Sequence, residues 1–212
     1  MTFINDSLKK EIDPILAKLS KNVKLVYFTQ KTECRFCSET RELLTELSGL
    51  SPMINLEVLD FQADRMRAKE LGIDKIPATV VMADENRGIR FFGIPSGYEF
   101  ASLLDAIHMV SLQETELSQE TRTFLDNLQT DIHLQVFVTP TCPYCPGAVT
   151  LAHRMAHYSP RVKADMLEAT EFPHLAQKYN VMGVPRTVIN ESVFLEGAAP
   201  ESMLVEKIRS SL

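Results

Sequence analysis

The feature that most constrains the fold is an internal repeat with a spacing of 108 residues. Two cysteine pairs and a later proline recur in one register: Cys34, Cys37 and Pro77 return as Cys142, Cys145 and Pro185. Self-similarity at a fixed spacing indicates a duplicated structural unit. The chain has 212 residues, enough for two domains of ordinary size. We therefore predict two tandem domains of the same fold, residues 1–112 and 113–212.

Both halves contain the same predicted elements in the same order. Apolar spacing predicts, in the first half, helices over 7–19, 37–47, 63–71 and 96–110, strands over 23–29 and 54–61, and a hairpin of 79–82 with 89–92. The second half repeats this with helices over 117–128, from Pro143, over 171–179 and over 200–210, strands over 133–138 and 162–167, and a hairpin over 187–196. Strands separated by helices favour parallel pairing, and the hairpins add antiparallel strands. The fold class is therefore α/β, with a central mixed β-sheet flanked by helices in each domain, and the short linker 111–117 indicates that the domains touch.

The predicted helices carry two further patterns. Apolar stripes at 43, 44 and 47 and at 204, 205 and 208 are expected to face the core. His153 and His157 stand four residues apart, a spacing that also occurs in metal sites. We interpret this histidine pair as part of a solvated helix face.

Charge and hydropathy exclude several classes of partner. The net charge is −6, and neither half gathers its lysines and arginines into a basic patch, which argues against nucleic acid and anionic membranes. No segment reaches the roughly 18 unbroken apolar residues of a membrane span. The first residues have neither the basic start nor the apolar run of a signal peptide. We therefore expect a cytoplasmic protein.

Each cysteine pair lies between a predicted strand and a predicted helix, a position in which the first cysteine of a Cys-x-x-Cys motif is reactive. Free backbone N–H groups and the positive end of the helix favour a thiolate there, and the thiolate is the form that attacks disulfides. Cys142 is expected to attack and form a mixed disulfide, which Cys145 then resolves. Cys34 and Cys37 are expected to act in the same way.

The two motifs differ in the residues around their cysteines. Arg35 places a cation beside Cys34 that should stabilise a thiolate, whereas Glu33 opposes it. Pro143 suits the first position of a helix, while Pro146 is expected to remove one early helix bond. We predict that the second pair is the dominant one.

Two other uses of the cysteines fit less well. A zinc site built from two such pairs usually has about 15–20 residues between them, whereas 104 residues intervene here. A static disulfide across two residues closes too small a loop to add much stability. Redox chemistry is therefore the favoured interpretation.

Three segments resemble the glutaredoxin-like protein disulfide oxidoreductases of archaea and thermophilic bacteria. They are residues 92–100, 137–146 and 183–187, and the tandem arrangement extends the resemblance over the whole chain. The resemblance implies two thioredoxin-like domains packed together, with reductase, oxidase or isomerase activity on protein disulfides. It implies no cofactor beyond the redox-active cysteine pairs.

The resemblance also assigns substrate-binding positions. In the thioredoxin fold Pro77 and Pro185 would be cis and face the cysteines, and the backbones of Ile76 and Val184 would pair with an extended substrate segment. Thioredoxins also carry a buried acid six residues before the first cysteine. The two corresponding positions here are apolar: Phe28 and Val136.

Three functional hypotheses follow. The leading one is a general oxidoreductase for protein disulfides, reduced by a thioredoxin-reductase-like flavoprotein. The second is a dedicated electron carrier from a flavoprotein reductase to a peroxiredoxin, because the amino-terminal part of the alkyl hydroperoxide reductase flavoprotein is similar in its double-domain plan. The third, from another class, is a peptide-binding chaperone module in which the cysteines are incidental.

Overall fold

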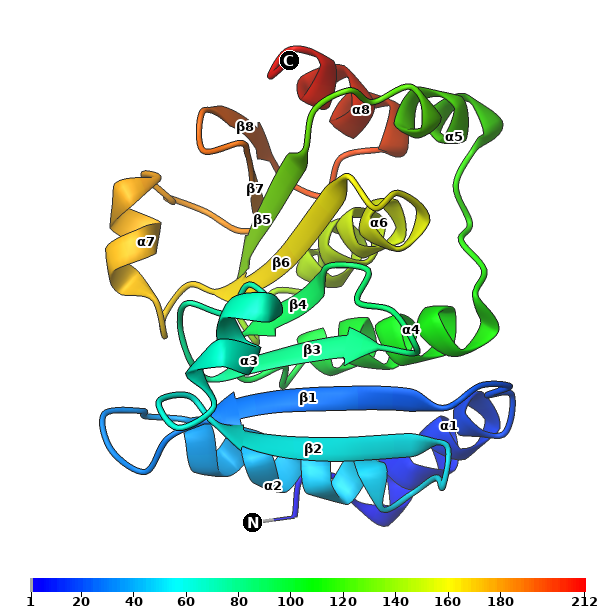
Figure 1. Cartoon of the computed structure of the whole chain (residues 1–212), viewed down its shortest axis with the longest axis vertical. Coiled ribbons are helices and arrows are strands. Elements are labelled where there is room, and N and C mark those ends of the chain that lie inside the picture. Colours follow the sequence, from blue (N-terminus) through cyan, green and yellow to red (C-terminus); the bar gives the residue numbers. More distant parts are fainter. Residues whose placement is uncertain (1) are drawn as a thin grey trace.

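The computed structural model describes residues 2–212, and its strands form one sheet that runs through both halves (Figure 1). The strands are β1 (Val23–Thr29), β2 (Ile54–Asp60), β3 (Ala78–Met82), β4 (Ile89–Phe92), β5 (Ile132–Val138), β6 (Val162–Glu168), β7 (Arg186–Ile189) and β8 (Val193–Glu196). Their order across the sheet is β2-β1-β3-β4-β6-β5-β7-β8. Each half contributes one parallel pair, β1 with β2 or β5 with β6, and two antiparallel pairs. The predicted mixed sheet and the repeat are confirmed.

Helices cover both faces of this sheet (Figure 1). They are α1 (Asp6–Leu16), α2 (Cys37–Ser48), α3 (Arg65–Glu70), α4 (Glu99–Leu112), α5 (Gln119–Asp126), α6 (Cys145–Tyr158), α7 (Pro173–Lys178) and α8 (Glu201–Arg209). The α3 and α7 regions pack on one face, and the other helices pack on the opposite face. Side chains of a strand alternate between the faces, so Leu25 and Tyr27 join one cluster and Val26 and Phe28 the other. The predicted apolar stripes are buried, which confirms them as core: Leu43, Leu44, Leu47, Leu204, Val205 and Ile208.

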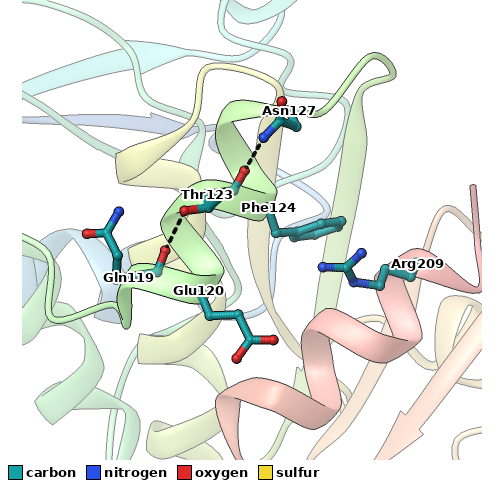
Figure 2. A pocket seen from close by; sticks show the side chains of 6 residues that line it. All are labelled: Gln119, Glu120, Thr123, Phe124, Asn127 and Arg209. Carbon is teal, nitrogen blue, oxygen red and sulfur yellow. Dashed lines mark hydrogen bonds between the residues drawn. The ribbon is translucent and has the colours of Figure 1, made fainter.

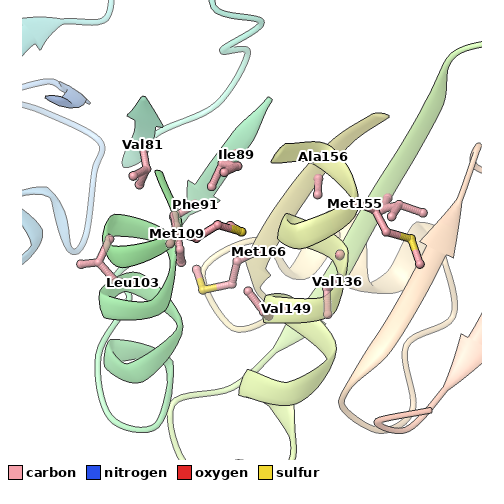
Figure 3. Close-up of a cluster of buried hydrophobic side chains, with 14 of the residues drawn as sticks. Val81, Ile89, Phe91, Leu103, Met109, Val136, Val149, Met155, Ala156 and Met166 are labelled. Carbon is pink, nitrogen blue, oxygen red and sulfur yellow. The ribbon is translucent and has the colours of Figure 1, made fainter. Parts of the chain in front are cut away.

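The two halves are joined by strand pairing. Residues 89–92 of β4 pair in parallel with residues 164–167 of β6. On one face of this joint α4 packs against α6, and Phe91, Met109 and Met166 lie in one buried cluster (Figure 3). The prediction that the halves touch is confirmed, and their contact is a continuous sheet with a shared core.

A buried ion pair also crosses the joint. Arg90 Nε of β4 donates to Asp165 Oδ1 of β6 at 2.7 Å, and His133 Nε2 lies 2.6 Å from the other carboxylate oxygen. Burial by itself raises the pKa of Asp165, but the Arg90 guanidinium and His133 hold it below its ordinary value. The carboxylate is therefore charged and fully engaged, and removing one partner alone would leave a buried charge unpaired.

His153 shows that the prediction of a solvated helix face was wrong. This side chain is 1% exposed, its ring meets Phe91 edge-on with centroids 4.8 Å apart, and its Nε2 lies 3.3 Å from the carbonyl oxygen of Arg90. Burial lowers the pKa of His153 to about 4. The physical reason is that α6 packs on the first half, a neighbour that the pattern of one helix does not reveal.

Two kinds of feature are absent from residues 2–212. Within this range no group of three or more His, Cys, Asp or Glu side chains could hold a metal ion. None of the helices that the structure describes is long and apolar enough to cross a bilayer.

Candidate redox sites

Both cysteine pairs form disulfides at the amino-terminal ends of helices. Cys34 is bonded to Cys37 and Cys142 to Cys145, with a Cα–Cα distance of 5.5 Å in each pair. The second cysteine of each pair is the first residue of its helix, α2 or α6. The first cysteine lies in the loop between β1 and α2 or between β5 and α6, three residues before the helix start, whose N–H groups have no partner within the helix. The structure therefore places both pairs where a thiolate is stabilised on reduction.

In each pair the first cysteine is more exposed to solvent than the second. Cys34 is partly exposed and Cys37 is 4% exposed. Cys142 is 8% exposed and Cys145 is fully buried. This order suits attack by the first cysteine and resolution by the second, the roles that were predicted for them and that stay predictions.

The start of α6 corrects two predictions about prolines. Pro143 lies in the loop, because the helix begins at Cys145 with Tyr144 as its N-cap. Pro146 therefore occupies the second position of the helix, where the backbone N–H has no helical partner. Contrary to expectation, Pro146 removes no helix bond and is compatible with a straight helix.

The predicted cis prolines are confirmed, and they lie at equivalent places in the two halves. The peptide bonds Ile76–Pro77 and Val184–Pro185 are both cis. The carbonyl oxygen of Pro77 accepts from the N–H of Gly93 at 2.9 Å, and that of Pro185 from the N–H of Gly197 at 2.8 Å. Each cis proline is thus tied to the turn that follows the hairpin of its own half.

The second site shows direct contact between this segment and the cysteines. The carbonyl oxygen of Val184 lies 3.7 Å from Cys142 Sγ, so the residue before the cis proline borders the outer sulfur. Around the site, Tyr144 is 72% exposed and Met182 is 86% exposed. Exposed apolar side chains beside a backbone edge offer a surface that a polypeptide can contact.

A buried acid that the sequence analysis missed begins α4, a helix of the first half whose start is bonded to the loop of the second site. Glu99, the first residue of α4, is 1% exposed, and burial raises its pKa to about 7. Its Oε2 accepts from the Ser102 hydroxyl at 2.7 Å, while Oε1 has no partner within residues 2–212. The adjacent Tyr98 N–H donates to the carbonyl oxygen of Pro140 at 3.0 Å, and Pro140 comes two positions before Cys142. The first half therefore brings the start of α4, which carries this acid, to the loop before the second pair, whose own strand has Val136 at the position of the thioredoxin acid.

A pocket elsewhere on the second half is separate from this chemistry. It encloses about 340 Å³ between α5 and α8, and neither cysteine pair lines it (Figure 2). The Arg209 guanidinium lies over the Phe124 ring at 4.5 Å, and the polar side chains of Thr123 and Asn127 bond to carbonyls of α5 itself. Their hydrogen bonds are thus already used within the helix.

Comparisons with known proteins agree with the fold and with the two cysteine pairs. The thioredoxin domain family matches residues 132–210. A protein disulfide oxidoreductase from Aeropyrum pernix K1 superposes with a TM-score of 0.91 and 28% identity, over 100% of this chain and 94% of that one. The chain thus shares with that protein a tandem thioredoxin fold, here with two Cys-x-x-Cys pairs. It is a thiol–disulfide oxidoreductase with two Cys-x-x-Cys sites.

The chain is also similar to part of a longer protein, the alkyl hydroperoxide reductase component AhpF. The protein from Staphylococcus aureus (strain Mu50) is 28% identical over 209 residues, which cover 98% of this chain and 38% of the relative. The structure of AhpF from Enterococcus faecalis, a C503A mutant, superposes with a TM-score of 0.91 at 29% identity, over 98% of this chain and 100% of that one. The chain thus spans about two fifths of the length of the curated relatives it matches.

Proposed function

We propose that this oxidoreductase exchanges disulfides with protein substrates, with Cys142 and Cys34 as nucleophiles and Cys145 and Cys37 as resolving residues. The observation that carries the proposal is the second site's geometry. The outer sulfur of Cys142 borders the backbone of Val184, next to a cis proline, and side chains at the rim are exposed. An extended polypeptide could hydrogen-bond to this backbone edge while its disulfide meets Cys142.

The chemistry at the second pair proceeds in two exchanges. The Cys142 thiolate attacks a substrate disulfide, forms a mixed disulfide and releases one substrate sulfur, which takes up a proton. The Cys145 thiol then loses its proton and attacks Cys142 Sγ, which releases the second substrate sulfur as a thiol. Two electrons pass to the substrate, and the chain ends with the Cys142–Cys145 disulfide that the structure contains. We propose that Glu99, a buried carboxyl at the start of α4, accepts the Cys145 proton.

The same positions are proposed for the first pair. Ile76 and Pro77 would hold a substrate beside Cys34, as Val184 and Pro185 would beside Cys142. We also propose the division into domains at residues 112 and 113, which falls where α4 ends at Leu112 and before α5 begins at Gln119.

A relay from a flavoprotein reductase to a peroxiredoxin is the second candidate. It is favoured by the match of 98% of this chain to the AhpF component of an alkyl hydroperoxide reductase. In this role a thioredoxin-reductase-like flavoprotein would reduce the chain, and a peroxiredoxin disulfide would be the substrate, in the cytoplasm. The exchange chemistry at each cysteine pair is the same in both roles.

One comparison separates these roles from a chaperone module. Insulin-disulfide reduction with dithiothreitol is measured beside peroxide turnover coupled through a peroxiredoxin. Faster insulin reduction supports the general oxidoreductase, and coupling to the peroxiredoxin alone supports the relay. If a variant with all four cysteines replaced by serine matches the wild type in preventing aggregation and neither redox assay responds, the chaperone hypothesis holds instead.

A further inference from the structure

Glu171, an acid of the second half, lies against the turn that follows the hairpin of the first half. Gly93 follows β4 and has φ +93°. A Cβ atom placed there would lie 2.6 Å from the Cβ of Glu168 and 2.7 Å from Oε1 of Glu171. Glu171 Oε1 also accepts the backbone N–H of Ile94 at 2.6 Å. The absence of a side chain at Gly93 thus makes room for these two acids from the other half.

This turn belongs to the first redox site. The N–H of Gly93 donates to the carbonyl oxygen of Pro77, the cis proline of that site, at 2.9 Å. Glu171 accepts from the next residue, Ile94, and so its carboxyl group lies close to the edge proposed to hold a substrate. Glu171 reaches this turn because it follows β6, the neighbour of β4, whereas the equivalent residue of the first half, Ala63, follows the edge strand β2.

Charged groups from several elements face the Glu171 carboxyl. Arg35, between the two cysteines, and Glu39 of α2 act on it electrostatically, and so does Glu168 of β6. Burial first, and then Glu168, raise the pKa of Glu171 to about 7, although the Ile94 N–H and Arg35 act in the opposite direction. Tyr27 of β1 also faces it, but burial raises the pKa of Tyr27 to about 12, so this phenol stays neutral.

Glu168 is a second buried acid of the second half beside this turn. It is 1% exposed, and its Oε2 accepts from the Thr170 hydroxyl and the Glu171 N–H, both at 2.7 Å. Its other oxygen, Oε1, is buried without a partner within residues 2–212.

We propose that Glu171 is a positioning residue of the first cysteine pair, supplied by the second half, which controls how far Arg35 stabilises the Cys34 thiolate. When Glu171 is ionised, its charge offsets that of Arg35, and the thiolate is less favoured. When Glu171 is protonated, Arg35 acts on Cys34 alone. The inference rests on the proposed use of this pair in disulfide exchange.

The consequence is a pH-dependent reduction potential at the first pair. Two glutathione thiols reduce the Cys34–Cys37 disulfide to two cysteines and become glutathione disulfide, so two electrons are transferred. Stabilising the Cys34 thiolate favours the reduced form. Because ionised Glu171 opposes the thiolate, the pair is more reducing above the pKa of about 7 than it would be with a neutral residue at this position.

The experiment isolates the first pair in the full-length chain. In a background with Cys142 and Cys145 replaced by serine, the equilibrium with reduced and oxidised glutathione is measured at about pH 5.5 and about pH 8.5, either side of the Glu171 pKa of about 7. Glu171→Gln removes the charge but keeps an oxygen to accept the Ile94 N–H, so the local fold is retained. Glu206→Gln, an exposed position of α8, makes the same charge change at the far edge of the sheet.

We expect Glu171→Gln to shift the equilibrium toward the reduced form by about three- to tenfold at the higher pH, the size of a charge effect at a partly solvated site. At the lower pH the shift should be less than about twofold, since the wild-type carboxyl is then protonated. Glu206→Gln should shift it at neither pH.

An equal shift at both pH values, or none at the higher one, would overturn the proposal. If Glu171→Gln does not fold, Arg35→Gln alone provides the test. Because Arg35 lowers the pKa of Glu171, its removal should move the inflection of the wild-type titration, near pH 7, to higher pH, and an unmoved inflection counts against the proposal. Glutathione is the only partner in these measurements. A failure here is therefore distinct from a failure of the proposed action on protein disulfides.

Discussion

Replacing Gly97 by alanine tests whether the first half builds the loop of the second site. Gly97 has φ +62°, and a Cβ there would collide with the carbonyl oxygen of Pro140. The same oxygen accepts the Tyr98 N–H at 3.0 Å. Gly197 is the matched control, because its φ is +75° but no atom lies within 4 Å of the added Cβ.

The two substitutions share one cost and differ in another. An alanine with positive φ costs about 1–2 kcal/mol at either position. The collision at Gly97 involves backbone, which yields only if the Pro140 loop shifts, and overpacking of this kind costs about 1–3 kcal/mol more. We therefore expect Gly97→Ala to lower the free energy of unfolding by about 2–5 kcal/mol and Gly197→Ala by about 1–2 kcal/mol.

Urea unfolding of the oxidised proteins measures these differences. Alkylation of Cys142 in the reduced proteins, with Cys34 and Cys37 replaced by serine, reports on the loop itself. Gly97→Ala should change the alkylation rate severalfold and Gly197→Ala should leave it near the wild-type value. Equal destabilisation by both variants, with equal alkylation rates, would refute the claim that Pro140 is held by the first half.

Three further predictions concern the acids and the cysteines. Glu99→Gln should raise the free energy of unfolding at pH 8 by an amount on the order of 3 kcal/mol but not at pH 4, because a raised folded-state pKa costs stability as the pH rises from 4.5 to about 7. The same variant should slow disulfide reduction severalfold. An unchanged pH profile of stability would contradict the burial argument. Alkylation of the fully reduced chain, followed by peptide mass spectrometry, should label Cys34 and Cys142 before Cys37 and Cys145, and the reverse order would exchange their roles. Cys142→Ser should remove most insulin reductase activity, whereas Cys34→Ser should leave a substantial part; a greater loss with Cys34→Ser would make the first pair the dominant one.

Most of the fold could be predicted because the sequence repeats and each element has its own hydrophobic period. The strand over 23–29 is observed with the predicted bounds, and helix ends differ by a few residues, as at α4, which begins at Glu99. Periodicity identifies the buried side of an element but not the element that covers it. The pairing of β4 with β6 therefore went unpredicted, and His153 was assigned to solvent although the first half covers it.

The same limit applies to the redox sites. The cysteines and cis prolines could be found because spacing within one half defines them. Glu99 and Glu171 could not, since each packs toward the other half and neither recurs in the repeat. Ala63 stands 108 residues before Glu171, and Met203 stands 104 residues after Glu99, because the hairpin of the first half is four residues longer. Glu99 gave no signal in the sequence, because an acid in the first turn of a helix is ordinary.

Trapping the mixed disulfide tests the central claim most directly. A reduced variant that retains Cys142 alone, with the other three cysteines replaced by serine, is mixed with a protein that contains a disulfide, and the products are separated without reductant. We predict a covalent adduct that dithiothreitol reverses and that mass spectrometry maps to Cys142, whereas a variant retaining Cys145 alone forms little adduct because that sulfur is fully buried. No adduct at Cys142, or a faster one at Cys145, would contradict the proposed exchange mechanism.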